Sequence, residues 1–212
     1  MPELENEDKE ILLRLKEDFA DYTNKDLIKY VYNNYPYYAI NSTIAHKFLT
    51  HLELEKINNQ KPTSNDYTLF TVGYEGKTID EYLNCLILNN IKILCDVRKN
   101  PISMKYGFSK NQLKTGLDKL EIRYEHLPEL GIESAKRKKL NNEIDYIHLF
   151  KDYEENTLPA KGVVLNRLYE LFLQYKRVAL TCFENKPQFC HRHKITDYYS
   201  NQSSWNYNIV NL

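Results

Sequence analysis

Residues 67–98 read YTLFTVGYEGKTIDEYLNCLILNNIKILCDVR, and this stretch decides the fold. An apolar run over residues 67–72 predicts a strand, and a second apolar run over residues 91–97 predicts another. Between the two runs, Thr78 and Glu81 form a capping box that opens a helix. Two strands joined by a helix need a crossover connection, so we expect them to lie parallel in one sheet.

The same alternation of strand and helix continues to the end of the chain. Helices are predicted at 109–120, opened by a Ser109 and Gln112 capping box, at 144–175 and from Pro187; strands are predicted at 122–127, 177–183 and 207–212. Crossovers of this kind place helices on both faces of a sheet. The sequence therefore predicts an α/β fold, Rossmann-like and three-layered, with a mostly parallel five-stranded sheet.

The chain before residue 67 has a different pattern. Three helices are expected here. The first spans residues 4–19, the second begins at a cap formed by Thr23 and Asp26, and the third spans residues 42–54. Residues 59–66 carry turn formers without periodicity, which indicates a linker. We therefore divide the chain into a helical N-terminal extension at 1–58, a linker at 59–66 and an α/β domain at 67–212. The extension is a candidate for binding a protein partner, and we expect the α/β domain to fold without it.

The charge of the chain is balanced, with 29 Lys and Arg against 29 Asp and Glu. Such a chain lacks the global positive field that holds a protein on nucleic acid without sequence preference. Binding of nucleic acid would have to come from a local patch. The one short basic run is Lys136-Arg137-Lys138-Lys139, and runs of this length are usually solvated faces of loops or helices.

The sequence also bears on the compartment. No stretch approaches the roughly 18 apolar residues that a membrane span needs, and the acidic start, residues 1–6, argues against a secretory signal. Four cysteines in such a chain are typical of reduced thiols and not of a disulfide framework. These features predict a cytoplasmic protein without membrane contact.

Polar residues follow the predicted strands at the point where each strand ends. They are Gly73 and Tyr74 after the first strand, Asp96 and Arg98 after the second, His126 after the third, and Cys182 and Glu184 after the fourth. The carboxyl ends of parallel strands meet at one edge of a sheet, where ligands bind in open α/β folds. We therefore expect these residues to share one pocket.

Asp96 and Arg98 are separated by one residue, so they point to the same face if the strand continues through them. In one interpretation they form a structural ion pair that fixes the following loop. In the other, Asp96 orients Arg98, whose planar guanidinium binds a carboxylate or phosphate.

Cys182 and Glu184 have the same spacing, and a helix from Pro187 would place Cys190, His191 and Arg192 in its first turns. The positive end of a helix and neighbouring cations favour a thiolate, so Cys190 is the preferred nucleophile. Alternatively, Arg192 and the backbone N–H groups at the helix start hold an anionic oxygen.

A metal site is the third interpretation of these cysteines and histidines. Their spacing matches no common zinc finger, and adjacent residues such as Cys190 and His191 diverge when they lie on a helix. The sequence also has no Walker loop and no Gly-rich dinucleotide turn. We therefore predict no metal ligands and no cofactor.

Six motifs in order resemble the domain-of-unknown-function family 488: Thr71–Gly76, Asp96–Ser103, Gly107–Ser109, His126–Gly131, Cys182–Glu184 and Cys190–Arg192. The resemblance covers about residues 67–212. It implies a cytoplasmic α/β domain of a bacterium or archaeon whose motifs converge on one pocket, and it brings no known reaction. His193 departs from the basic or small residue expected at that position, which keeps the metal alternative open.

The pocket hypothesis assigns two sets of residues. The candidate catalytic residues are Cys190, Cys182, Glu184, His191 and Asp96, and the candidate ligand-binding residues are Arg98, Arg192, Gly73, Tyr74, Ser103 and His126. The predicted function is an enzyme acting on a phosphorylated, nucleotide-like or nucleic-acid ligand. The alternatives are a non-catalytic module that binds a nucleotide or nucleic acid, and a Cys/His metal or redox site.

Overall fold

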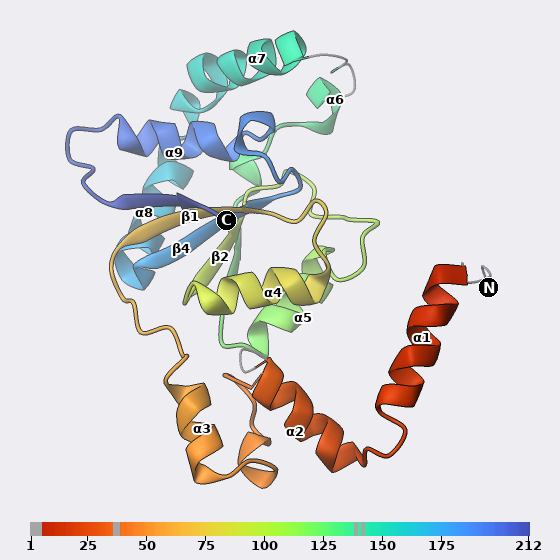
Figure 1. Cartoon of the computed structure of the whole chain (residues 1–212). Coiled ribbons are helices and arrows are strands. Elements are labelled where there is room, and N and C mark those ends of the chain that lie inside the picture. The colour runs from red at the N-terminus through yellow and green to blue at the C-terminus, as the bar shows by residue number, and fades with distance from the viewer. Residues whose placement is uncertain (1–5, 36–38, 138–139, 141–142) are drawn as a thin grey trace. The chain divides into compact units, whose positions relative to one another are not determined.

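Figure 1 shows the computed structural model of the chain, which describes residues 6–35, 39–137, 140 and 143–212. The chain divides into two units, Met1–Lys61 and Pro62–Leu212. No helix in the described part of the chain is long and apolar enough to cross a bilayer.

The first unit is helical. It contains α1 (Asn6–Asp18), α2 (Asn24–Asn34), the short 3-10 turn η2 (Ala45–Lys47) and α3 (His51–Asn58). Thr23 and Asp26 cap α2 reciprocally, as predicted. The helix predicted at 42–54 has the wrong bounds, because the capping box of Thr50 and Glu53 starts α3 at His51. The first residues of the helix predicted at 4–19 lie outside the described residues.

The second unit contains a five-stranded sheet. Its strands are β1 (Thr68–Gly73), β2 (Ile93–Asp96), β3 (Arg123–His126), β4 (Arg177–Cys182) and β5 (Asn208–Asn211). Their order is β3-β2-β4-β1-β5, and every neighbouring pair is parallel. The predicted α/β fold class is confirmed, and the sheet is wholly parallel where the sequence predicted a mostly parallel one.

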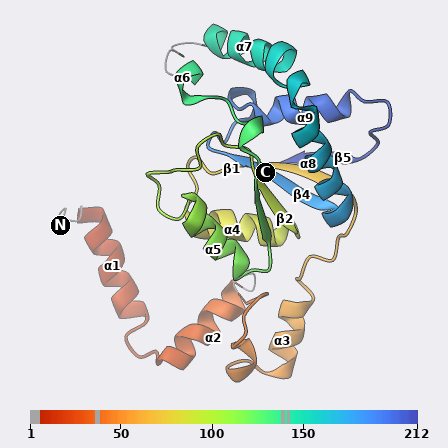
Figure 2. The same cartoon turned by 180° about the vertical axis from the view of Figure 1, so that it is seen from behind.

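Helices cover both faces of the sheet (Figures 1 and 2). The helices α4 (Ile79–Leu88) and α5 (Lys110–Asp118) pack on one face through a core that includes Tyr82, Leu94 and Leu113. The other face packs against α8 (Gly162–Tyr175) and α9 (Arg192–Ser200) through a core that includes Leu168, Leu180 and Ile195. Apolar strand residues thus alternate between two separate cores.

Two predicted helices differ in their details. The Thr78–Glu81 capping box opens α4 as expected, but Ser109 caps nothing with its side chain. Its hydroxyl instead bonds to both backbone groups of Ser103, and Gln112 accepts a bond from Gly107 N. These contacts close the 103–109 loop, so the predicted Ser109–Gln112 box is wrong.

The helix predicted at 144–175 is broken in the structure. The chain runs through η3 (Pro128–Leu130), α6 (Ser134–Arg137), α7 (Glu143–Asp152), the π-helical turn η4 (Tyr153–Thr157) and the 3-10 turn η5 (Pro159–Lys161) before α8 begins. Pro159 lacks the N–H that a continuous helix would need at this point, which accounts for the break.

The strand order makes the end of β4 a switch point. After β1 and β2 the chain leaves toward the face of α4 and α5, whereas after β4 it leaves toward the opposite face and α9. Because β4 lies between β1 and β2, connections diverge on both of its sides. Such divergence opens a crevice at the carboxyl end of a parallel sheet, where ligands bind.

Candidate functional site

Cys182 is the last residue of β4 and lies at this switch point. Side chains alternate along the strand, so Cys182 shares a face with Leu180, on the side that α9 covers. Its Sγ donates to Oε2 of Glu184, 3.2 Å away, and lies 4.0 Å from Nδ1 of His191. The side chain is buried yet still borders the pocket described below.

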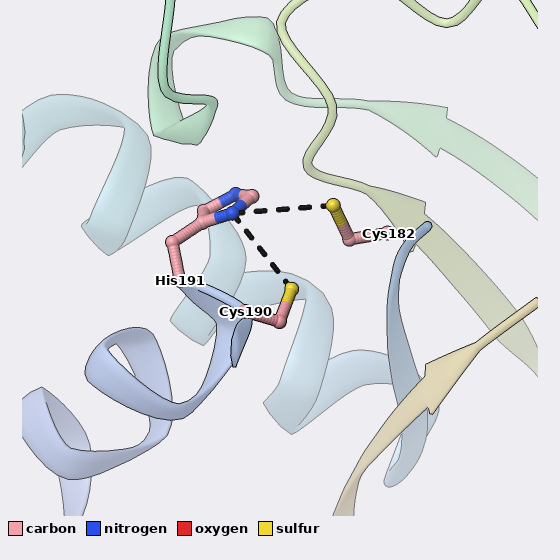
Figure 3. A group of neighbouring side chains, drawn as sticks. All are labelled: Cys182, Cys190 and His191. Atoms are coloured by element: carbon pink, nitrogen blue, oxygen red, sulfur yellow. Dashed lines mark hydrogen bonds between the residues drawn. The ribbon is translucent and has the colours of Figure 1, made fainter. Parts of the chain in front are cut away.

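Cys190 and His191 precede α9. The predicted helix from Pro187 is a single 3-10 turn, η6 (Pro187–Phe189); Cys190 then adopts an extended backbone, and α9 starts only at Arg192. The prediction that Cys190 lies in a helical first turn is therefore wrong. The extended residue turns both side chains toward Cys182, as Figure 3 shows, so the expectation that Cys190 and His191 diverge is also wrong.

His191 is oriented by a backbone carbonyl of the residue that follows β2. Its Nε2 lies 3.1 Å from the oxygen of Val97, which can only accept, so Nε2 carries the hydrogen. In the neutral ring Nδ1 then bears the lone pair, 4.0 Å from Cys182 Sγ and 3.9 Å from Cys190 Sγ. His191 thus turns its acceptor nitrogen, Nδ1, toward both thiols.

Arg137, at the end of α6, is a site residue that the sequence analysis missed. It pairs with Oε1 of Glu184 and donates to Nδ1 of His191 at 3.1 Å. In the basic run that contains it, Lys136 pairs with the exposed Asp152, as expected of a solvated face, and Lys138 and Lys139 lie outside the described residues. Only the run itself pointed to a cation here, and nothing in it singled out Arg137.

Burial and neighbouring groups shift the pKa values of Glu184 and Cys182. Burial acts to raise the pKa of Glu184, but Arg137 and hydrogen bonds to the carboxylate outweigh it and hold the pKa below its usual value. Contact with Cys190 and burial raise the pKa of Cys182 well above the usual value for a thiol. A raised pKa favours the protonated thiol, consistent with the donation of Cys182 to Glu184.

Asp96 and Arg98 form a buried structural pair. Asp96 accepts from Nε and Nη2 of Arg98 and from the hydroxyl of Tyr124, and Nη1 of Arg98 donates to Tyr74 and to the carbonyl of Phe108. These partners occupy the guanidinium, so the predicted anion-binding role of Arg98 is not supported. Asp96 is fully buried and holds this network together, which fits the structural interpretation and not a catalytic one.

Arg192 is likewise taken up by the fold. Its Nη1 donates to the carbonyl of Val72 and its Nη2 to that of Glu184, 2.6 Å away. Only 1% of the surface of Arg192 is exposed, so its guanidinium is not accessible to a ligand. The prediction that Arg192 binds an anion is therefore wrong. The residue instead joins the ends of β1 and β4.

The other candidate ligand-binding residues mainly support loops. Gly73 has no β-carbon, which allows the backbone of Glu184 to approach closely. The ring of Tyr74 stacks on that of Phe108 with centroids 4.3 Å apart. Nε2 of His126 lies 3.0 Å from the carbonyl oxygen of Arg98, and Nδ1 of the same ring lies near Nζ of Lys110. Ser103 borders the pocket and accepts from Lys105 N.

A pocket of about 440 Å³ opens beside Cys182. It is lined by Tyr74, Arg98, Lys99, Asn100, Ile102, Ser103, Met104, Lys105, Ile132, Arg137, Cys182, Phe183 and His191. Five predicted site residues are thus brought together: Tyr74, Arg98, Ser103, Cys182 and His191. Cys190 and Glu184 lie behind the lining residues and contact His191 and Cys182, respectively. Four predicted site residues do not line the pocket: Asp96, Arg192, Gly73 and His126.

The pocket wall is positively charged. Lys99, Lys105 and Arg137 line it beside Arg98, and no carboxylate is among the described lining residues. Lys105 donates to the carbonyl of Tyr74, while Lys99 is exposed and makes no ion pair with any described residue. The described lining thus carries four cationic side chains and no anionic one.

Comparison with known proteins bears on the family. The family model described as "Domain of unknown function DUF488" matches residues 78–199. This range runs from the cap of α4 to α9 and includes Cys182, Cys190 and His191, but not Gly73 or Tyr74. No curated protein and no solved structure matches the chain.

Proposed function

The chain belongs to the DUF488 family, and from its site we propose that it is an enzyme that acts on a phosphorylated or nucleotide-like ligand, with Cys182 as the nucleophile. The observation that carries the proposal is the convergence of a thiol, an oriented imidazole and a row of cations on one pocket wall. Nucleophile, base and anion-binding groups are the components that covalent catalysis on an anionic substrate requires.

Access decides between the two thiols. Cys182 lines the pocket, whereas Cys190 is fully buried and does not. The proposal therefore moves the nucleophile from Cys190, which the sequence favoured, to Cys182. Cys190 then lies behind the nucleophile and raises its pKa.

His191 supplies the proton acceptor that a protonated thiol needs. In the proposed step Sγ of Cys182 forms a bond to an electrophilic atom of the ligand, and the bond from that atom to its leaving group breaks. The thiol proton passes to Nδ1 of His191 and then to the leaving group. Water afterwards displaces the sulfur, which recovers a proton.

Arg137 connects ligand binding to this proton transfer. The guanidinium of Arg137 donates to Nδ1 of His191, which occupies the acceptor. An anionic group in the pocket would draw the guanidinium toward itself, because Arg137 also lines the wall. His191 would then be free to accept the proton of Cys182.

Alkylation of the reduced chain tests the proposal. Iodoacetamide labelling of Cys182 and Cys85 is followed by peptide mass spectrometry, with and without inorganic phosphate or adenosine monophosphate. Both anions should slow the labelling of Cys182 and leave Cys85 unchanged, since Cys85 is on α4 away from the pocket lining. Lys99→Gln should weaken this protection, whereas the matched Lys92→Gln outside the pocket should not.

Two outcomes would change the proposal. If neither anion alters the labelling of Cys182, the ligand class is wrong. If calorimetry shows that the anions bind while Cys182 stays inert across the thiol pH range, the pocket belongs to a binding module and not to an enzyme.

A further inference from the structure

We propose that Cys182, Cys190 and His191 form a binding site for a thiophilic divalent cation such as Zn²⁺, with one coordination position open to the pocket. The inference goes beyond the proposed reaction and does not depend on it. It stands on the arrangement of three buried ligand atoms, contributed by the end of β4 and by the segment before α9 (Figure 3).

The distances fit a tetrahedral ion. The two sulfurs and Nδ1 of His191 all lie within 4.8 Å of one another, and the sulfur-to-nitrogen distances are 4.0 and 3.9 Å. Zinc bonds of about 2.3 Å to sulfur and about 2.0 Å to nitrogen place a sulfur and a nitrogen about 3.6 Å apart, and two sulfurs about 3.8 Å apart, around a tetrahedral ion. The two sulfur-to-nitrogen distances therefore need to shorten by a few tenths of an ångström, and the sulfur-to-sulfur distance, which is within 4.8 Å, by no more than about 1 Å.

The hydrogen bond of His191 to Val97 selects the correct ring nitrogen. Histidines that bind metals commonly donate their other N–H to a carbonyl or carboxylate, which fixes the tautomer and the ring orientation. Here Nε2 donates to the oxygen of Val97 at 3.1 Å, and Nδ1 faces the sulfurs. The outer partner of a metal-binding histidine is thus already in place.

The fourth position faces the pocket, because Cys182 and His191 both line it. Three protein ligands with an open position are typical of zinc sites that bind water or a substrate, while closed structural sites use four. Glu184 is engaged by Arg137, so it leaves this position to a small molecule.

Arg137 opposes the cation. Its Nη2 donates to Nδ1 of His191 at 3.1 Å, the atom that the metal would bind, and its positive charge repels the ion. Metal binding must therefore displace this contact and release both thiol protons, so that M²⁺ and two thiolates form a neutral unit. Removing the charge of Arg137 should tighten binding.

Cobalt titration of the reduced full-length chain tests the site. One Co²⁺ per chain should produce thiolate-to-cobalt charge-transfer absorption with the visible bands of a tetrahedral ion, and Zn²⁺ should displace it. Cys182→Ser and Cys190→Ser should each weaken binding by more than the 10- to 100-fold, roughly, that loss of an outer partner costs. Cys85→Ser, outside the cluster, is the matched control and should bind as the unaltered chain does.

The arginine variant gives a second, independent readout. Arg137→Gln should bind cobalt more tightly than the unaltered chain, and both should release two protons per ion in weakly buffered solution. Absence of charge-transfer absorption, or cobalt binding that survives both serine substitutions, would overturn the metal site. Alkylation of the metal-free chain reports on the thiol chemistry separately, so a failure of the metal site and a failure of the proposed enzyme are distinguishable.

Discussion

The carbonyl oxygen of Glu184 passes so close to Gly73 that a β-carbon added at Gly73 would lie 2.0 Å from it. Gly73 is the last residue of β1 and is paired with Cys182, the last residue of β4, and Glu184 lies two residues beyond Cys182. Glycine at this position therefore allows the segment that carries Glu184 to fold back over β1. The positions of the thiol and of its carboxylate neighbour depend on that approach.

Gly73→Ala should destabilise the protein by about 1–3 kcal/mol, because backbone atoms have to move to admit a methyl group. Gly162→Ala is the matched control, since a β-carbon there meets nothing within 4 Å. It should be neutral or slightly stabilising. Urea denaturation measures both, and equal midpoints for the two variants would refute the steric argument.

Asp96→Asn should lower the free energy of unfolding by about 3–5 kcal/mol, because it leaves Arg98 buried without its charged partner. Asp118→Asn breaks only an exposed pair with Lys114 and should cost less than about 1 kcal/mol. At a temperature where Asp96→Asn remains folded, its Cys182 should be alkylated at the normal rate. A folded variant with altered thiol reactivity would instead indicate a role for Asp96 in the site.

Cys190→Ala should lower the pKa of Cys182, because contact with Cys190 is the largest cause of its elevation. Burial remains, so the pKa should stay above its usual value. The midpoint of the alkylation rate against pH should move to lower pH, and the thiolate fraction at pH 8 should rise about tenfold for each unit of the shift. Cys95→Ala, which changes a core cysteine, should leave the midpoint where it was.

Glu184→Gln should remove an acid-dependent part of the stability. The pKa of Glu184 is lowered from 4.5 in the folded state, so its contribution is fully present above about pH 4.5 and is lost as pH falls through the folded pKa. At pH 7 the variant should be less stable by about 1–3 kcal/mol, and the difference should shrink on acidification. A difference that is constant from pH 7 to pH 3 would contradict this, and Glu155→Gln, in an exposed pair, should show no such trend.

The sequence predicted the sheet and the edge at which the site lies, because both follow from local patterns. Apolar runs separated by capped helices specify a parallel sheet, and a parallel sheet brings Cys182 and the exit of β2 to one edge. The order of the strands depends on how helices pack over the sheet, which no single segment encodes. The divergence of connections around β4 could therefore not be predicted.

The roles of the arginines could be predicted only in part. The ion pair of Arg98 with Asp96, two residues away, is one of two interpretations of the sequence, whereas the bonds of Arg98 to Tyr74 and of Arg192 to Val72 join segments 24 and 120 residues apart. Arg137 reaches the thiols from a four-residue helix, too short for a periodic pattern. The convergence of Cys190 and His191 depends on one extended residue between η6 and α9, a backbone choice that residue types alone leave open.

The place of β4 in the sheet also determines when the protein can fold during synthesis. β1 pairs only with β4 and β5 among the described strands, so the apolar residues 68–73 have no strand partner until residues 177–182 have left the ribosome. Over the intervening hundred or so residues, a nascent chain can pair β2 with β3 but cannot join them to β1. The strand that ends in Cys182 thus joins the two halves of the sheet late, and Cys190, His191 and β5 follow it. A chain that stops short of β4 would expose an unpaired apolar strand to aggregation.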